Sequence, residues 1–304
     1  MRRLAAAAVV LLALAGCART ARPTVARVIA VETFLADIAR EVAGDRIAVQ
    51  ALLPIGVDPH AFEPAPRDVA AIADASLLIV NGAGFEAFLS RLLEGLGGTG
   101  KGPRIVEAAA GLVPRLPREG EPSGGHESDP HFWLDPLSAI RYVENIRDAL
   151  GDFDPSGAPV YERNAAAYVA KLRDLDRWIA AEVATVPPGD RLLVTNHESL
   201  GYFADRYGFR VVGTVIPSVS TGSTPGAKQL AALVERIRAT GARAVFLETG
   251  ADSRLAAQVA GEVGARLVTD LYTHSVTEPG GPAPTYLQMM RADTRAIVGA
   301  LRAP

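Results

Sequence analysis

The sequence is poor in several residue types, and each shortage excludes something. Among 304 residues there is one cysteine, so no disulfide can form within the chain. The formal net charge is only -3, without the basic excess that nucleic-acid binders usually carry, so we expect no nucleic-acid partner. Charged residues make up 21% and hydrophobic residues 49%, which excludes a disordered chain. What remains is a globular protein long enough for two domains of roughly 100–200 residues each.

Residues 1–16 are predicted to be a signal peptide. Two arginines precede an uncharged apolar run over residues 4–16, which is shorter than the roughly 20 residues that a membrane-spanning helix needs. The run ends in Leu-Ala-Gly before Cys17, which resembles the bacterial lipobox, where the cysteine is lipidated; a plain signal peptide that contains a cysteine is the alternative. We therefore expect an extracytoplasmic protein, held to the bacterial cell membrane by a lipid on Cys17, with residues 17–24 as a tether.

Apolar runs of β-forming residues alternate with stretches of helical spacing in the mature part of the chain. Residues 25–30 and 47–53 are examples of the first kind, and residues 32–42 of the second. Such alternation favours an α/β fold, with a central, mostly parallel sheet flanked by helices. Residues 75–109 and 241–270 share the layout strand, turn, helix, strand, which indicates two lobes built on one plan.

One long helix is predicted between the two lobes. Residues 160–186 contain no glycine or proline and have apolar side chains at helical spacing, and helix breakers stand on both sides of them. A helix of this length reaches roughly 40 Å, enough to run the length of a small domain. We therefore predict a rigid linking helix over residues 159–187, between an N-terminal lobe of residues 25–158 and a C-terminal lobe of residues 188–304. Two shorter helices with a bend are the alternative.

Four of the five histidines fall where a turn or the end of a strand is expected, one in each quarter of the fold. They are His60, His131, His197 and His274. In an open α/β sheet, ligands bind at the carboxyl ends of the strands, so four imidazoles arriving there could meet at one point. A single histidine in such a loop is more often a surface or hydrogen-bonding residue. The fourfold arrangement makes a shared metal site the competing interpretation.

Four motifs are more specific than this spacing. The longest is Leu-Pro-Ile-Gly-Val-Asp-Pro-His-Ala-Phe-Glu-Pro at residues 53–64, and the others lie at residues 81–86, 129–136 and 195–198. Together they resemble the zinc and manganese solute-binding lipoproteins of bacterial ABC importers, and the resemblance covers nearly the whole mature chain. It implies two α/β lobes connected by a rigid helix, a metal ion bound between the lobes, and delivery of that ion to an ABC importer permease.

The resemblance also implies the metal ligands. The first two ligands of the family match His60 and His131, and the third, a histidine or glutamate, matches His197. The fourth is usually an aspartate just before a serine; here His274 takes that place, which makes it the expected fourth ligand and Asp270 the alternative. Imidazole suits Zn²⁺, and four neutral imidazoles can close a tetrahedron around it, whereas Mn²⁺ prefers oxygen ligands. We expect Zn²⁺ as the transported ion, with Mn²⁺ as the alternative.

Ligating histidines normally have their second ring nitrogen fixed by a carboxylate or a carbonyl group. Carboxylates near a ligand or at a strand end are the candidates, although each could instead cap a helix or lie on the surface. They are Glu63, Asp135, Glu198 and Glu248. Because imidazole binds metal only when it is neutral, zinc competes with up to four protons, and its affinity is expected to fall steeply below about pH 6.

Two other functions can be weighed against metal transport. A secreted zinc-dependent hydrolase would use three protein ligands, a bound water and a base such as Glu198, but the sequences His-Glu-x-x-His and Gly-x-Ser-x-Gly are absent. Some relatives have been described as mediating cell adhesion, yet the chain offers no adhesive motif. We expect a monomeric binding protein rather than an enzyme. Because the linking helix is rigid, metal release is expected to need only small lobe shifts and rearranged loops around His197 and His274.

Overall fold

The computed structural model describes residues 27–302 apart from three gaps, at residues 90–91, 94–101 and 117–127. The predicted signal peptide, the tether and Cys17 therefore lie outside the described residues, as does the fifth histidine, His126. Within the described part of the chain, no helix is both long enough and apolar enough to cross a membrane.

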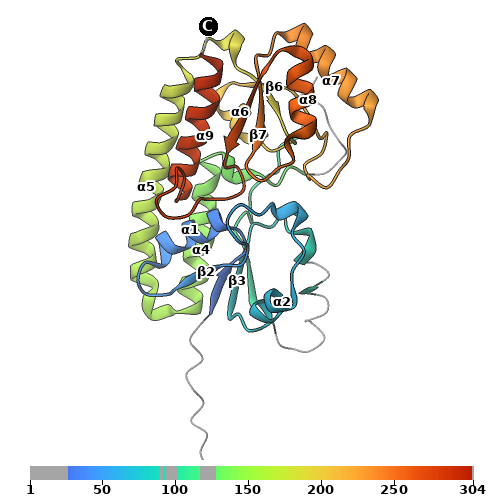
Figure 1. Cartoon of the computed structure of the whole chain (residues 1–304). Helices are drawn as coiled ribbons and strands as arrows, with labels where there is room; N and C mark the ends of the chain where they lie inside the picture. The colour runs from blue at the N-terminus through green and yellow to red at the C-terminus, as the bar shows by residue number, and fades with distance from the viewer. Residues whose placement is uncertain (1–26, 90–91, 94–101, 117–127, 303–304) are drawn as a thin grey trace, which may run out of the picture.

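Each lobe is built on a four-stranded parallel sheet (Figure 1). The first sheet has the order β2-β1-β3-β4, and the second repeats this pattern as β6-β5-β7-β8. The strands are β1 (Val28–Ala30), β2 (Val49–Ala51), β3 (Leu77–Val80), β4 (Arg104–Glu107), β5 (Leu192–Thr195), β6 (Arg210–Thr214), β7 (Ala244–Glu248) and β8 (Arg266–Leu271). Strands β3 and β5 are buried along their whole length, as parallel strands covered on both faces should be. The predictions of an α/β fold and of two lobes are confirmed.

Helices cover the sheets and connect their strands. They are α1 (Thr33–Ala43), α2 (Pro66–Ala73), α4 (Ser138–Phe153), α5 (Ala158–Val183), α6 (Gly201–Tyr207), α7 (Ala227–Thr240), α8 (Ser253–Val263) and α9 (Tyr286–Leu301). Four short 3₁₀ helices are η1 (Pro59–Ala61), η2 (Phe132–Leu134), η3 (Pro155–Gly157) and η4 (Pro188–Asp190). The first two of these, η1 and η2, carry or follow two of the histidines named above.

Helix α5 is the predicted long helix, and it is continuous over 26 residues. Pro159 lies in its first turn, where a proline has no intrahelical hydrogen bond to lose, and the helix ends at Val183, a few residues before the predicted end. Its buried side chains recur every three or four residues from Tyr161 to Val183. This stripe packs against α1 and α4 of the first lobe and α9 of the second, so α5 runs along both lobes (Figure 1).

One apolar core continues from the first lobe through α5 into the second lobe. Trp133 lies in it and is fully buried, with its ring stacked on Phe34 at a centroid distance of 4.4 Å. The indole Nε1 of Trp133 donates a hydrogen bond of 2.7 Å to the carbonyl oxygen of Thr273, and the hydroxyl of Tyr286 donates to the carbonyl oxygen of Trp133. Both partners belong to the second lobe. The two lobes are therefore joined by shared packing as well as by the long helix.

Candidate metal centre

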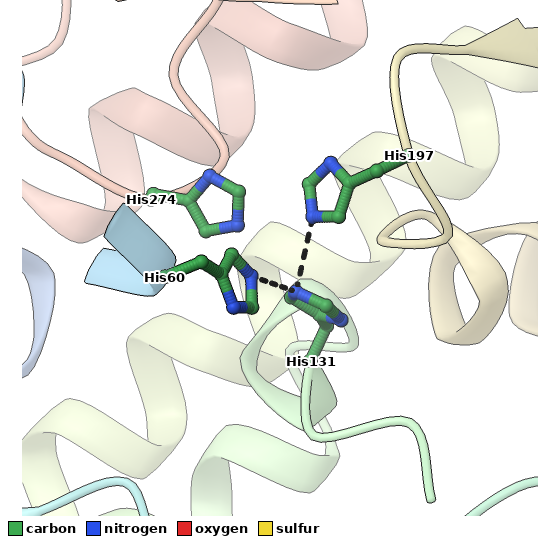
Figure 2. A group of neighbouring side chains, drawn as sticks. All are labelled: His60, His131, His197 and His274. Carbon is green, nitrogen blue, oxygen red and sulfur yellow. Dashed lines mark hydrogen bonds between the residues drawn. The ribbon is translucent and has the colours of Figure 1, made fainter. Parts of the chain in front are cut away.

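The four predicted histidines come together in one group (Figure 2). His60 lies in η1, which follows β2, and His131 directly precedes η2. His197 follows the end of β5, and His274 follows the end of β8. Each lobe thus contributes two rings, and those of the second lobe come from segments just past the carboxyl ends of strands, where ligands bind in parallel sheets.

Two of the distances between ring nitrogens match those of a tetrahedral metal site. One ring nitrogen from each histidine lies within 4.8 Å of the other three. The Nε2 atom of His131 is 3.3 Å from Nε2 of His60 and 3.4 Å from Nε2 of His197. In a tetrahedron with zinc–nitrogen bonds of about 2.0–2.1 Å, neighbouring nitrogens are about 3.3–3.4 Å apart. The Nε2 atom of His274 is buried and has no hydrogen-bond partner in the described structure, so it is available to the same ion.

Three of the rings are held in the neutral form that binds metal. Burial lowers the pKa of His131 and of His274 well below the ordinary range, and the nearby His197 lowers both further. Burial also lowers the pKa of His60 to about 3. The ring of Phe85 packs against these same three imidazoles and keeps one side of the group apolar.

His197 differs because a carboxylate stands behind its ring. Its burial opposes a positive charge, but Glu248 raises the pKa of His197 above the ordinary value. Oε1 of Glu248, at the end of β7, lies 3.1 Å from Nδ1 of His197 and accepts a hydrogen bond of 3.0 Å from Ser199. A carboxylate at this place favours a proton on Nδ1 and leaves Nε2 free for a metal ion. The structure thus brings Glu248, one of the four predicted supporting carboxylates, to the ring of His197.

A second supporting carboxylate was missed in the sequence. Oδ1 of Asp129 lies 2.8 Å from Nδ1 of His131 and accepts a hydrogen bond of 3.0 Å from its backbone N–H. Oδ1 of Asp58 accepts the corresponding backbone hydrogen bond, of 2.9 Å, from His60. The sequence Asp-Pro-His occurs at both places, so the repeated aspartate two residues before a histidine was the available signal.

The other predicted carboxylates do not join the histidine group. Glu63 and Asp270 are exposed on the surface. Asp135 accepts hydrogen bonds from the backbone of Leu137 and from Ser138 at the start of α4, which is the capping role given above as its alternative. The backbone N–H of Glu198 donates a hydrogen bond to the carbonyl oxygen of Ser218, and the carboxylate of Glu198 is not part of the group of four. Of the two candidates for the fourth position, the structure brings His274 to the group and leaves Asp270 outside it.

A cavity of about 440 Å³ lies beside His60. Its lining includes Phe85 and Ser128 of the first lobe and Val219 and Ser220 of the second. His60 is half-buried, whereas His131 and His197 are fully buried. An ion that comes through this cavity therefore meets His60 before the other rings.

Comparison with known proteins shows which family and which relatives this sequence resembles. The chain matches the family described as "Zinc-uptake complex component A periplasmic" over residues 28–300. It is 35% identical over 269 residues to the "Manganese-binding lipoprotein MntA" of Halalkalibacterium halodurans, which covers 88% of this chain and 86% of that protein. It is 33% identical over 272 residues to the "Iron-binding protein YfeA" of Yersinia pestis, with coverage of 89% and 85%.

Solved structures share the fold. A manganese-bound periplasmic metal-binding protein from Candidatus Liberibacter asiaticus is 30% identical, with a TM-score of 0.77 and coverage of 90% of this chain and 98% of that chain. The periplasmic zinc-binding protein TroA of Treponema pallidum gives a TM-score of 0.82 at 24% identity, with coverage of 91% and 99%, and supports the fold alone. The names of these relatives and structures include manganese, iron and zinc.

Proposed function

Because the chain belongs to the family of periplasmic zinc-uptake complex component A, we propose that it captures Zn²⁺ between its two lobes and delivers it to the permease of an ABC importer. As a member of this family it is an extracytoplasmic metal-binding protein of ABC transport and not an enzyme. The choice of zinc and the assignment of His60, His131, His197 and His274 as its ligands are the proposal. We further propose a lipid anchor at Cys17, in keeping with the lipoprotein names of relatives.

One observation supports the choice of zinc. The group contains four imidazoles and no carboxylate ligand, and two of the distances between its nitrogens fit tetrahedral zinc. Manganese, named for one relative, prefers oxygen ligands and a higher coordination number. All four rings come from one chain, so a monomer is sufficient to hold the ion.

Metal competition tests this choice. When the purified protein is stripped of metal and offered equal amounts of Zn²⁺ and Mn²⁺, we expect it to retain zinc, at about one ion per chain, because imidazole binds zinc more tightly than manganese. Elemental analysis after gel filtration measures both ions in one sample. Retention of manganese would refute the zinc assignment while leaving metal transport intact.

The lowered pKa values replace the steep fall in affinity below about pH 6, expected from four ordinary histidines, with a shallower pH dependence of zinc binding. Three of the rings have lowered pKa values and hold no proton for zinc to displace at mildly acidic pH. The groups that lose protons are His197, whose pKa is raised beside Glu248, and Asp129, whose pKa burial raises to about 7. The affinity for zinc is highest above these pKa values and falls as the pH drops through them. We therefore expect about one or two protons to be released per zinc ion, rather than four.

Titration calorimetry in buffers of different ionisation enthalpy counts the released protons. Glu248→Gln removes the charge that raises the pKa of His197, so the fall in affinity should move to lower pH in this variant. Release of about four protons near pH 6 would contradict the low pKa values of the other three rings.

A further inference from the structure

The loop of residues 54–58, between β2 and η1, meets three different loops of the second lobe. The backbone N–H of Gly56 donates a hydrogen bond of 2.9 Å to Oγ of Ser275, next to His274. Oδ2 of Asp58 accepts a hydrogen bond of 2.6 Å from Oγ1 of Thr221, which lies between β6 and α7. Gly250, after β7, lies against the carbonyl oxygen of Gly56. This loop therefore forms a contact between the two lobes beside the metal centre.

Asp58 connects this contact directly to His60. One carboxylate oxygen of Asp58 accepts the backbone N–H of His60 at 2.9 Å, and the other accepts the hydroxyl of Thr221 at 2.6 Å. The first bond fixes the start of η1, the short helix that carries the imidazole. The same side chain thus holds His60 and reaches into the opposite lobe.

The segment of Thr221, which donates the hydrogen bond to Asp58, also borders the cavity beside His60. Val219 and Ser220 line that cavity, and Thr221 follows them in the chain. If Thr221 leaves Asp58, the wall of the cavity and the support of His60 change together. His60 is also the least buried of the four rings.

The contact at Gly250 is too close for any side chain. Gly250 has a φ of +86°, and a Cβ atom placed on it would lie 2.7 Å from the carbonyl oxygen of Gly56. Gly241 offers a matched comparison, because its φ is +71° and a Cβ there would meet nothing within 4 Å. Alanine at the two positions therefore differs mainly in whether it pushes against the other lobe.

We propose that Asp58 is a positioning residue. It accepts a hydrogen bond from Thr221 of the second lobe, and this bond keeps Asp58 where it holds His60 in the metal-binding group. Loss of that bond loosens His60, the ring that faces the cavity, and so speeds the departure of the ion. The inference rests on the proposed function, since it needs His60 to be a zinc ligand.

The test is the rate at which zinc leaves the loaded protein, followed by stopped flow with a coloured chelator in excess. Thr221→Val removes the hydroxyl and is expected to raise the dissociation rate roughly tenfold, the effect of one hydrogen bond to a charged group, with little change in the association rate. Thr221→Ser restores the hydroxyl and should restore the slow rate. Thr249→Val is the matched control, because Thr249 lines the same small cleft as Thr221, whereas the hydrogen bond to Asp58 comes from Thr221.

Gly250→Ala should likewise speed dissociation, because it displaces the second lobe from the 54–58 loop, whereas Gly241→Ala should not. Melting of the metal-free proteins checks that each variant is folded. The inference is overturned if the dissociation rates of Thr221→Val and Gly250→Ala equal those of their controls, or if Thr221→Ser fails to restore the slow rate. A wild-type protein that retains no zinc would instead overturn the proposed function, and this inference with it.

Discussion

Replacing His197 with alanine is expected to weaken zinc binding by roughly a hundred- to a thousandfold. Structural zinc sites with four protein ligands bind with apparent free energies of about 10–16 kcal/mol, so one ligand in four accounts for about 2.5–4 kcal/mol. The expected loss is at the upper end because His197 is fully buried and its removal leaves the carboxylate of Glu248 without the ring beside it.

Competition with a chelator of known zinc affinity measures the change. The control is His126→Ala, since His126 is the fifth histidine of the chain and is not one of the proposed ligands. We expect the control to bind like the wild type. A His197→Ala protein that loses less than about threefold in affinity would show that the ion is held elsewhere.

The second large effect is on stability and involves Trp133. Truncating this fully buried indole to alanine is expected to lower the free energy of unfolding by about 3–5 kcal/mol, because it opens a cavity in the core shared by the lobes. The side chain also stacks on Phe34 and donates to the carbonyl oxygen of Thr273, and alanine makes neither contact. Such a loss is a large part of the roughly 5–15 kcal/mol that stabilises a typical domain.

Urea denaturation of the metal-free protein, followed by circular dichroism, measures this loss. Trp178 provides the control, since it is the other tryptophan of the chain and lies half-buried on α5 beneath Arg291 and Arg295. We expect Trp178→Ala to cost about 1 kcal/mol, and equal losses in the two variants would be evidence against a shared core at Trp133. If the alanine variant does not fold, Trp133→Phe is measured in its place, because it keeps an aromatic ring but loses the hydrogen bond.

The sequence predicted what depends on local pattern. The spacing of apolar side chains and the flanking prolines predicted α5 within a few residues, because a proline is tolerated in the first turn of a helix and prolines after it prevent its continuation. The alternation of strands and helices predicted two parallel sheets, and the positions of His197 and His274 just after a strand followed from it.

What could not be predicted depends on contacts between distant segments. Glu248 and Asp135 both looked able to support a ligand, but only the packing of β7 beside β5 brings Glu248 to His197. The hydrogen bond from Trp133 to Thr273 joins residues 140 positions apart, and no periodicity in the sequence records it. Asp129 is different, because its Asp-Pro-His motif is local, and the contact of its carboxylate with the ring of His131 spans only two residues.

The two carboxylates that contact the rings, Asp129 and Glu248, would also match the charge of the proposed site to that of a divalent ion. A bare dication in an interior of neutral imidazoles would be poorly solvated, and two negative groups directly behind the rings compensate its charge. A monovalent ion would leave this interior negative and a trivalent ion would leave it positive. In the proposed site, discrimination by charge would come from the carboxylates, and discrimination among divalent ions from the softness of the nitrogen donors.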